Sequence, residues 1–180
     1  MRRIDLETKL NRDRAWLLDT YAALSDERLH RGLTPSEHDQ ANLWTPLDHL
    51  AHLALIEHNF VAMIRRHVSG DPNPVGLLNN TDGTPRSRAD IMASVHLMTE
   101  QWQLKHRGSD LDAVVALGQH ARAVSLTLLS ELTDEQLGEV LPGAPWADGT
   151  IGGVIGANAD HGRMHWKWVT DAFEAAGDPV

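Results

Sequence analysis

The chain has 180 residues, no cysteine and a formal net charge of −9. This length is typical of one domain with a sizeable core, so we expect a single domain over residues 1–180. The lack of cysteine excludes disulfides, thiolate metal sites, iron–sulfur clusters and a cysteine nucleophile, and the acidic balance without a basic run argues against nucleic-acid binding.

The N-terminal segment lacks the pattern of an export signal. Arg2 and Arg3 are basic, but Asp5 and Glu7 follow where an export signal needs an apolar run. No stretch of the chain approaches the ~20 apolar residues of a membrane span. We therefore expect a cytoplasmic protein that does not associate with membranes.

The first long helix is expected over residues 5–24, with apolar residues at helical spacing along one side. A linker that contains Gly32 follows. In this linker, Thr34, Pro35 and Glu37 have the spacing of the cap, the first residue and the third residue of a helix. The pattern predicts a short helical turn at this point.

The second long helix has a stronger start signal. Thr45 is expected as its N-cap, Pro46 as its first residue and Asp48 as the third-position acid. The helix is expected to continue to about Val68. Residues 70–86 are rich in Gly, Pro, Asn and Asp and predict a long loop, and loops of this length are often functional.

The rest of the chain predicts further helices and no strands. These are a helical stretch over 87–105, a third long helix over 111–132, a short turn at 133–136 and a fourth long helix from about residue 150. No alternating run of polar and apolar residues competes with this assignment. The sequence therefore predicts an all-α four-helix bundle with long connecting loops and short extra helical turns.

Two histidines on the last long helix give the strongest functional signal. His161 and His165 are one turn apart near the middle of its apolar face, and Asn158 lies just before them on the same face. Two imidazoles at this spacing can bind one metal ion, with ring nitrogens about 2.0–2.1 Å from it. The alternative is two separate core histidines, each hydrogen bonded to a backbone carbonyl.

A metal ion needs at least one more protein ligand, and the second long helix offers candidates. His49 lies within the apolar arc of this helix and His52 at its edge, so periodicity alone slightly favours His49. Glu57 also lies in the apolar arc, where a carboxylate needs a partner. We expect Glu57 either in a salt bridge to another helix or near the metal site.

Three short motifs are arranged as in a known family. They are Trp44-Thr45-Pro46, then His52-Leu53-Ala54 with Glu57 five residues beyond the histidine, and finally His161 with His165. In order, separation and placement on helices, they resemble the DinB/YfiT-like superfamily of metal-binding four-helix bundles, and the resemblance covers most of the chain. It implies that His52, His161 and His165 hold a divalent metal ion.

The same resemblance assigns supporting roles and shows one departure. His49, Glu57 and Asn158 become candidates for residues that orient the ligands from behind. Many family members carry a glutamine shortly after the second histidine of the late pair, whereas Trp166-Lys167-Trp168 follows here. Any substrate contact that the glutamine makes in the family is therefore not expected here. The three histidines of the metal site are unaffected.

The ligand set limits the metal and the chemistry. Three neutral imidazoles suit Zn(II), Ni(II), Fe(II) or Mn(II), and we expect zinc or nickel. Three protein ligands leave a position open for water or substrate, which is typical of catalytic sites. The resemblance implies a metal-dependent transferase of a low-molecular-weight thiol such as mycothiol or bacillithiol, or a hydrolase, with a small-molecule substrate and a homodimeric assembly. The sequence assigns no catalytic acid or base.

Two other classes of protein remain as alternatives. The first is a non-catalytic bundle that binds a metal ion or a small ligand. The second is an oxygen-binding or di-iron bundle, which needs paired Glu-x-x-His motifs. That second class is disfavoured, because the one such spacing in the chain, Glu27 to His30, lies in a linker.

Overall fold

Helices make up nearly all the regular structure of this computed structural model, which describes residues 2–77, 79–80 and 82–180. The helices are α1 (Arg3–Ala22), α2 (Asp26–Leu29), α3 (Pro46–Val68), α4 (Arg88–His106), α5 (Leu111–Glu131), α6 (Asp134–Leu137) and α7 (Ile151–Ala175). Two-residue strands, β1 (Thr34–Pro35) and β2 (Leu43–Trp44), form one antiparallel pair. The predicted all-α fold with short extra helical turns is confirmed.

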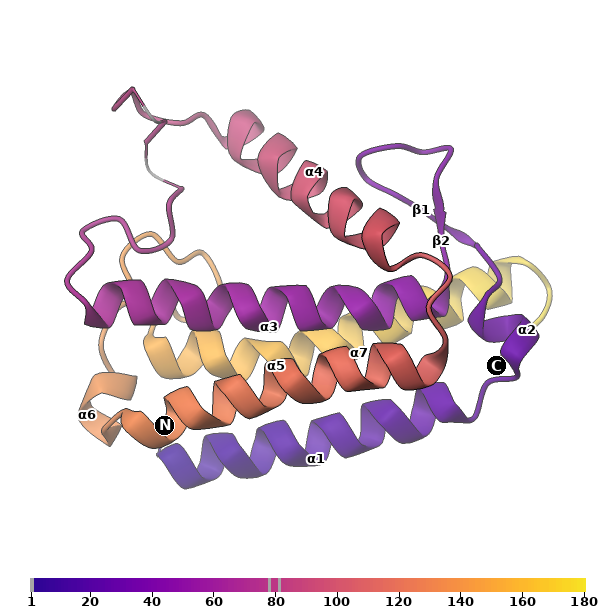
Figure 1. Cartoon of the computed structure of the whole chain (residues 1–180), viewed down its shortest axis with the longest axis horizontal. Coiled ribbons are helices and arrows are strands. Elements are labelled where there is room, and N and C mark those ends of the chain that lie inside the picture. The colour runs from indigo at the N-terminus through magenta and orange to yellow at the C-terminus, as the bar shows by residue number, and fades with distance from the viewer. Residues whose placement is uncertain (1, 78, 81) are drawn as a thin grey trace.

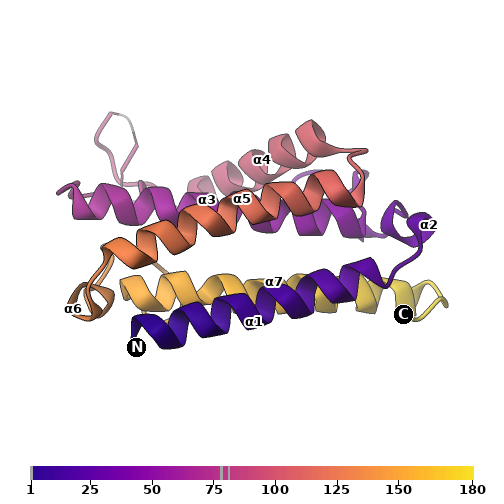
Figure 2. The same ribbon diagram turned by 60° about the horizontal axis from the view of Figure 1, so that its bottom comes forward.

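Four long helices, α1, α3, α5 and α7, form a bundle (Figures 1 and 2). The helix α3 packs against α5 and α7, and α1 packs against the same two helices. The chain runs in one direction in α1 and α7 and in the other in α3 and α5 (Figure 1). Because α3 and α5 run in the same direction, the chain must return between them, and α4 makes this return outside the bundle, against α3.

The start of α3 positions the histidines of this helix. Thr45 Oγ1 accepts a hydrogen bond from Asp48 N at 3.1 Å, and the Asp48 carboxylate accepts one from Thr45 N at 2.8 Å. Pro46 occupies the first turn, where backbone N–H groups make no hydrogen bonds within the helix, so the N–H that proline lacks is not needed. The predicted capping box is therefore present. None of the described helices combines the length and apolar content that a membrane crossing requires.

Removal of this cap is expected to weaken the bundle. Thr45→Ala should lower the free energy of unfolding by about 1 kcal/mol, because Asp48 N loses its acceptor. For a chain of this size, that change lowers the Tm by about 2–4 °C, measurable by circular dichroism. Thr127→Ala is the matched control, since the exposed Thr127 hydroxyl only donates to the Ala123 carbonyl. Equal shifts in the two variants would contradict the capping role.

The linker after α1 differs from the sequence prediction. The short helical turn expected at Thr34 is wrong, because Thr34 pairs instead with Trp44 in the strand pair. A single-turn helix occurs earlier, at Asp26–Leu29, where Ser25 Oγ accepts from Arg28 N. The strand pair joins the linker to the segment just before α3, so it holds Trp44 next to the first turns of that helix.

A layer of charged side chains interrupts the apolar core midway along the bundle. Two apolar clusters fill the interior on either side, and on α3 Glu57 lies between Leu53 of one cluster and Phe60 of the other. The layer, called the interior charged layer below, consists of Asp13 and Arg14 of α1, Glu57 of α3 and Arg122 of α5. Charged groups in such a position need partners, because burial removes their hydration.

Candidate metal centre

Three histidine side chains converge between α3 and α7. His52 comes from the second turn of α3, and His161 and His165 are one turn apart on α7. Each offers one ring nitrogen, and the three nitrogens lie within 4.8 Å of one another. The structure therefore brings together the three residues that the sequence motifs single out as metal ligands.

Burial keeps these imidazoles unprotonated at neutral pH. Loss of hydration lowers the pKa of His52 to about 3 and that of His161 to about 4. Burial, together with the neighbouring histidines, also holds the pKa of His165 well below its usual value. Unprotonated imidazole is the form that binds a metal ion, so the electrostatics of the cluster suit metal binding.

The spacing of the donor atoms also fits a metal ion. His165 Nε2 and His161 Nε2 are 2.9 Å apart. Two nitrogens bound to one tetrahedral ion at 2.0–2.1 Å are about 3.3 Å apart, so a small rotation of either ring would bring this pair to ligand geometry. Without an ion, the same pair forms a hydrogen bond in which one ring donates to the other. Three neutral nitrogen donors from two helices are a donor set suited to zinc or nickel.

His49 supports the cluster from behind. Its Nδ1 lies 2.9 Å from Nδ1 of His165, which leaves Nε2 of His165 directed at His161. Metal-binding histidines commonly use the second ring nitrogen for such a hydrogen bond, which fixes the tautomer and the ring orientation. The indole ring of Trp44 lies against both His49 and His52, with ring centroids 5.4 and 5.5 Å away.

Substitution of His49 tests the distinction between a ligand and a supporting residue. We expect His49→Ala to lower metal affinity by about 10–100-fold, because the orientation of the His165 ring is lost while all three donors remain. His52→Ala should instead remove stoichiometric binding. Competition with a chromophoric chelator measures both effects. If His49→Ala removes the ion and His52→Ala does not, then His49 is the ligand. That result would agree with the helical periodicity of the sequence, which slightly favours His49.

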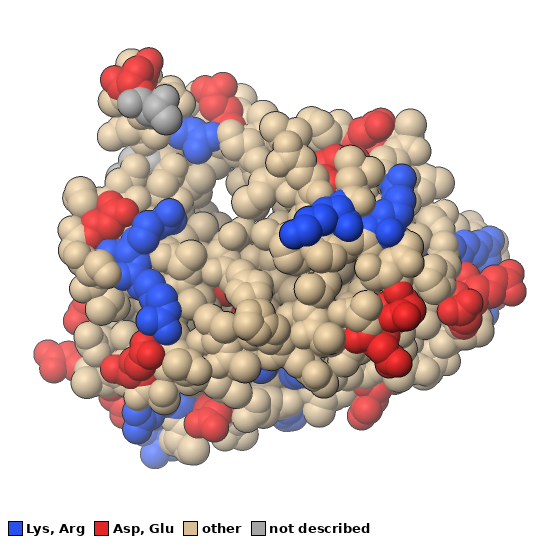
Figure 3. Space-filling view, in the orientation of Figure 1, with Lys and Arg blue, Asp and Glu red and all other residues tan. Residues whose placement is uncertain are grey.

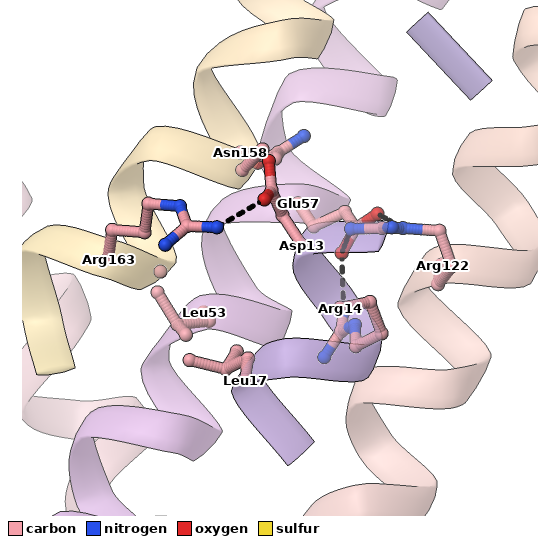
Figure 4. A pocket seen from close by; sticks show the side chains of 10 residues that line it. Asp13, Arg14, Leu17, Leu53, Glu57, Arg122, Asn158 and Arg163 are labelled. Carbon is pink, nitrogen blue, oxygen red and sulfur yellow. Dashed lines mark hydrogen bonds and ion pairs between the residues drawn. The ribbon is translucent and has the colours of Figure 1, made fainter. Parts of the chain in front are cut away.

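The other two candidate supporting residues, Glu57 and Asn158, line an interior cavity. Both Glu57 oxygens accept hydrogen bonds from guanidinium groups, at 2.8 Å from Arg14 and 2.6 Å from Arg122. The salt-bridge interpretation of Glu57 is thus confirmed, and no hydrogen bond within the described residues joins it to His52. Asn158 lines a small interior cavity beside Asp13 (Figure 4), so its expected role in orienting His161 stays a prediction.

The cluster is more exposed on one side than on the others. His52 and His165 are buried, whereas His161 is only partly buried and gives the cluster its contact with solvent. Trp168 packs on His165 with ring centroids 4.6 Å apart and is itself 40 % exposed. A ligand would therefore approach the cluster on the side of His161.

The fold and the cluster together place this protein in a structural class. It is a four-helix bundle with three histidines between two of its helices, and these histidines could hold a metal ion. A family model described as the DinB superfamily matches residues 32–169, which is more than half of the chain, and the chain belongs to this superfamily. The resemblance seen in the sequence motifs is thereby confirmed.

One solved structure with a similar fold is an uncharacterised protein from Escherichia coli UTI89. It is 14% identical in sequence, and the superposition has a TM-score of 0.58 over 99% of this chain and 96% of that chain. At this identity the similarity concerns the fold. No curated protein matches the sequence.

Proposed function

We propose that this protein binds one divalent ion, zinc or nickel, through His52, His161 and His165, and catalyses transfer of a low-molecular-weight thiol to a small electrophile. Hydrolysis of a small substrate is the related possibility at the same site. The observation that supports the proposal is the convergence of three neutral imidazoles with one side open to solvent. Membership of the DinB superfamily supports the same ligand set.

The residues around the cluster have separable tasks in this proposal. A bound ion there would supply Lewis-acid chemistry, which stabilises a thiolate or a hydroxide at neutral pH. His49 orients His165, and the buried Trp44 ring covers the rings of His49 and His52. The thiol must come from a cosubstrate, because the chain contains no cysteine. Glu57 is not assigned as a base, since two arginines occupy its oxygens.

A small-molecule substrate also has space near the start of α3. A cleft of about 690 Å³ lies between the β1–β2 connection and the end of α4, and its lining includes Thr45, Asp48 and Glu100. This volume is typical of sites that bind metabolite-sized ligands. The cleft adjoins the capping box, where Asp48 directly precedes His49, and none of the three clustered histidines lines it.

An activity assay tests the proposed reaction. Zinc- and nickel-loaded protein is mixed with several biological thiols and a chlorodinitrobenzene, and His161→Ala protein serves as the matched control. We expect loaded wild-type protein to exceed both the metal-free protein and the variant. A cobalt-substituted sample should change its visible spectrum when the correct thiol is added. Rates equal to those of metal-free protein with every thiol, without a spectral change, would favour a non-catalytic bundle that binds metal or a small ligand.

A homodimer and a cytoplasmic location stay part of the proposal. The helix α4 packs against the bundle through α3, and it exposes Met92, Leu97 and Leu104. Figure 3 shows that the middle of the face seen in Figure 1 carries mostly uncharged side chains, with a group of basic side chains above and to the right of the centre. Exposed apolar side chains of this kind support an interface between two copies. Light scattering with Leu97→Asp as the disrupting variant tests the assembly.

A further inference from the structure

The interior charged layer surrounds a small cavity that is distinct from the histidine cluster. The cavity lies between the bundle helices, and Figure 4 shows the charged side chains of α1, α3, α5 and α7 around it. Its lining includes Asp13, Arg14, Glu57, Arg122 and Arg163. None of the three clustered histidines lines this cavity.

The charges around the cavity do not balance. Arg14 and Arg122 are largely buried, and both pair with the same carboxylate, that of Glu57, which is 2% exposed. This group of three therefore carries one excess positive charge. The second buried carboxylate, Asp13, is already paired with Arg163 at 2.6 Å and with the exposed Arg12 at 3.3 Å. Asp13 is therefore neutralised by its own partners and does not compensate the excess charge.

One N–H group of Arg14 lacks a hydrogen-bond acceptor within the described residues. Its Nη2 donates to Glu57 at 2.8 Å and to the Gly118 carbonyl at 3.1 Å, but its buried Nε has no partner within the described residues. A buried N–H without an acceptor is unfavourable, and more so on a cationic group. Burial also lowers the pKa of Arg14, which reflects the same loss of hydration.

The surrounding helices hold the guanidinium group of Arg14 in a restricted space. A Cβ at Gly118 of α5 would lie 2.5 Å from Arg14 Nη1, so the absence of a side chain at Gly118 lets the guanidinium pass close to this helix. The cavity has a volume of about 20 Å³, so it has space for a single small occupant of about the size of a water molecule.

We propose that this cavity is a binding site for one monovalent anion of chloride size, held by the excess positive charge of the Arg14–Glu57–Arg122 group. The anion offsets the uncompensated charge of the two arginines that line the cavity. The Asp13 and Glu57 carboxylates also line the cavity, and their pairing with arginines is what permits an anion beside them. The inference does not depend on the proposed enzymatic function.

Thermal unfolding tests the site on the whole protein, with chelator present to remove bound metal. The Tm is measured in sodium chloride, sodium bromide and sodium gluconate at equal ionic strength. We expect a saturable increase in the two halides over gluconate, of about 3–6 °C at a halide concentration ten times Kd. Arg14→Met should remove the difference in Tm between the halides and gluconate, because the charges of Arg122 and Glu57 then cancel. Arg65→Met, which removes an exposed arginine paired with Glu131, should retain it.

Two further measurements keep the test decisive if Arg14→Met folds poorly. Arg14→Lys retains the positive charge and should retain the halide dependence. Crystals of wild-type protein grown in bromide should show one anomalous peak in the interior cavity. Equal Tm values in all three salts without that peak would overturn the proposal and leave water as the occupant. A halide dependence that is unchanged in Arg14→Met would place the anion elsewhere and overturn it as well.

Discussion

Substitution of either histidine on α7, His161→Ala or His165→Ala, is expected to abolish stoichiometric binding of zinc or nickel. Each substitution removes one of three donors that lie within 4.8 Å of one another. Loss of an orienting residue alone weakens such sites by about 10–100-fold, so loss of a ligand should exceed that range. Elemental analysis of protein purified without a nickel column, followed by titration calorimetry, measures the change.

Two other histidines provide the controls for this experiment. His58→Ala and His67→Ala should leave metal binding intact, since both residues lie on α3 but neither belongs to the cluster. Metal-loaded wild-type protein should also unfold at a higher temperature than metal-free protein, and this difference should vanish in the two α7 variants. Retention of one tightly bound ion per chain in His165→Ala would refute the three-histidine site.

The metal-free protein is expected to lose stability steeply below pH 6.5. Burial lowers the pKa of His49 to about 4 and that of His52 to about 3, whereas the value in the unfolded chain is 6.5. Below pH 6.5 the unfolded chain therefore takes up protons that the folded protein does not bind. Each such histidine lowers the free energy of unfolding by about 1.4 kcal/mol per pH unit, so His49 and His52 alone lower it by about 3 kcal/mol per unit. His161 and His165, whose pKa values are also lowered by burial, add to this loss.

This loss should continue until the pH approaches the pKa values in the folded state, near pH 4. A decrease of this size is a large part of the 5–15 kcal/mol that is typical of whole domains. Urea unfolding of chelator-treated protein at pH 7, 6 and 5 measures the slope. His49→Gln should reduce the number of protons taken up on unfolding by about one, which lowers the slope by about 1.4 kcal/mol per pH unit. A free energy of unfolding that stays constant from pH 7 to pH 5 would show that these histidines are hydrated in the folded protein.

Local sequence patterns predicted most of the helix starts because caps join residues three apart in the chain. Ser87 with Asp90, and Thr133 with Gln136, form capping boxes at the two helix starts that the sequence predicts at residues 87 and 133. The same reasoning was wrong at Thr34, since the backbone of Thr34 pairs with a partner beyond the range of any capping pattern. The short helix at Asp26–Leu29 was missed, although a serine cap precedes it.

The sequence narrowed the choice of third ligand without deciding it. Residues three apart on a helix point in directions about 60° apart, so periodicity separates His49 from His52 only weakly. The structure places both next to His165, with His52 in the cluster and His49 behind it. The difference between them depends on how α3 is rotated against α7, which is a tertiary property.

The interior charged layer could be anticipated only in part. Glu57 stands out in the sequence because a carboxylate on an apolar face needs a partner. Its partners, Arg14 and Arg122, are on two other helices, and nothing in their local sequence distinguishes them from surface arginines. The division of the core into two apolar clusters follows from the way in which these helices pack together.

The position of the histidine cluster has a consequence for the topology of the chain. Its ligands come from the second turn of α3 and the middle of α7, so an ion bound there would link segments about 110 residues apart and close a long loop. An ion that binds the folded chain and not the unfolded one would stabilise this long-range contact by an amount that rises with the free metal concentration. Metal supply would therefore help to set the stability of the fold.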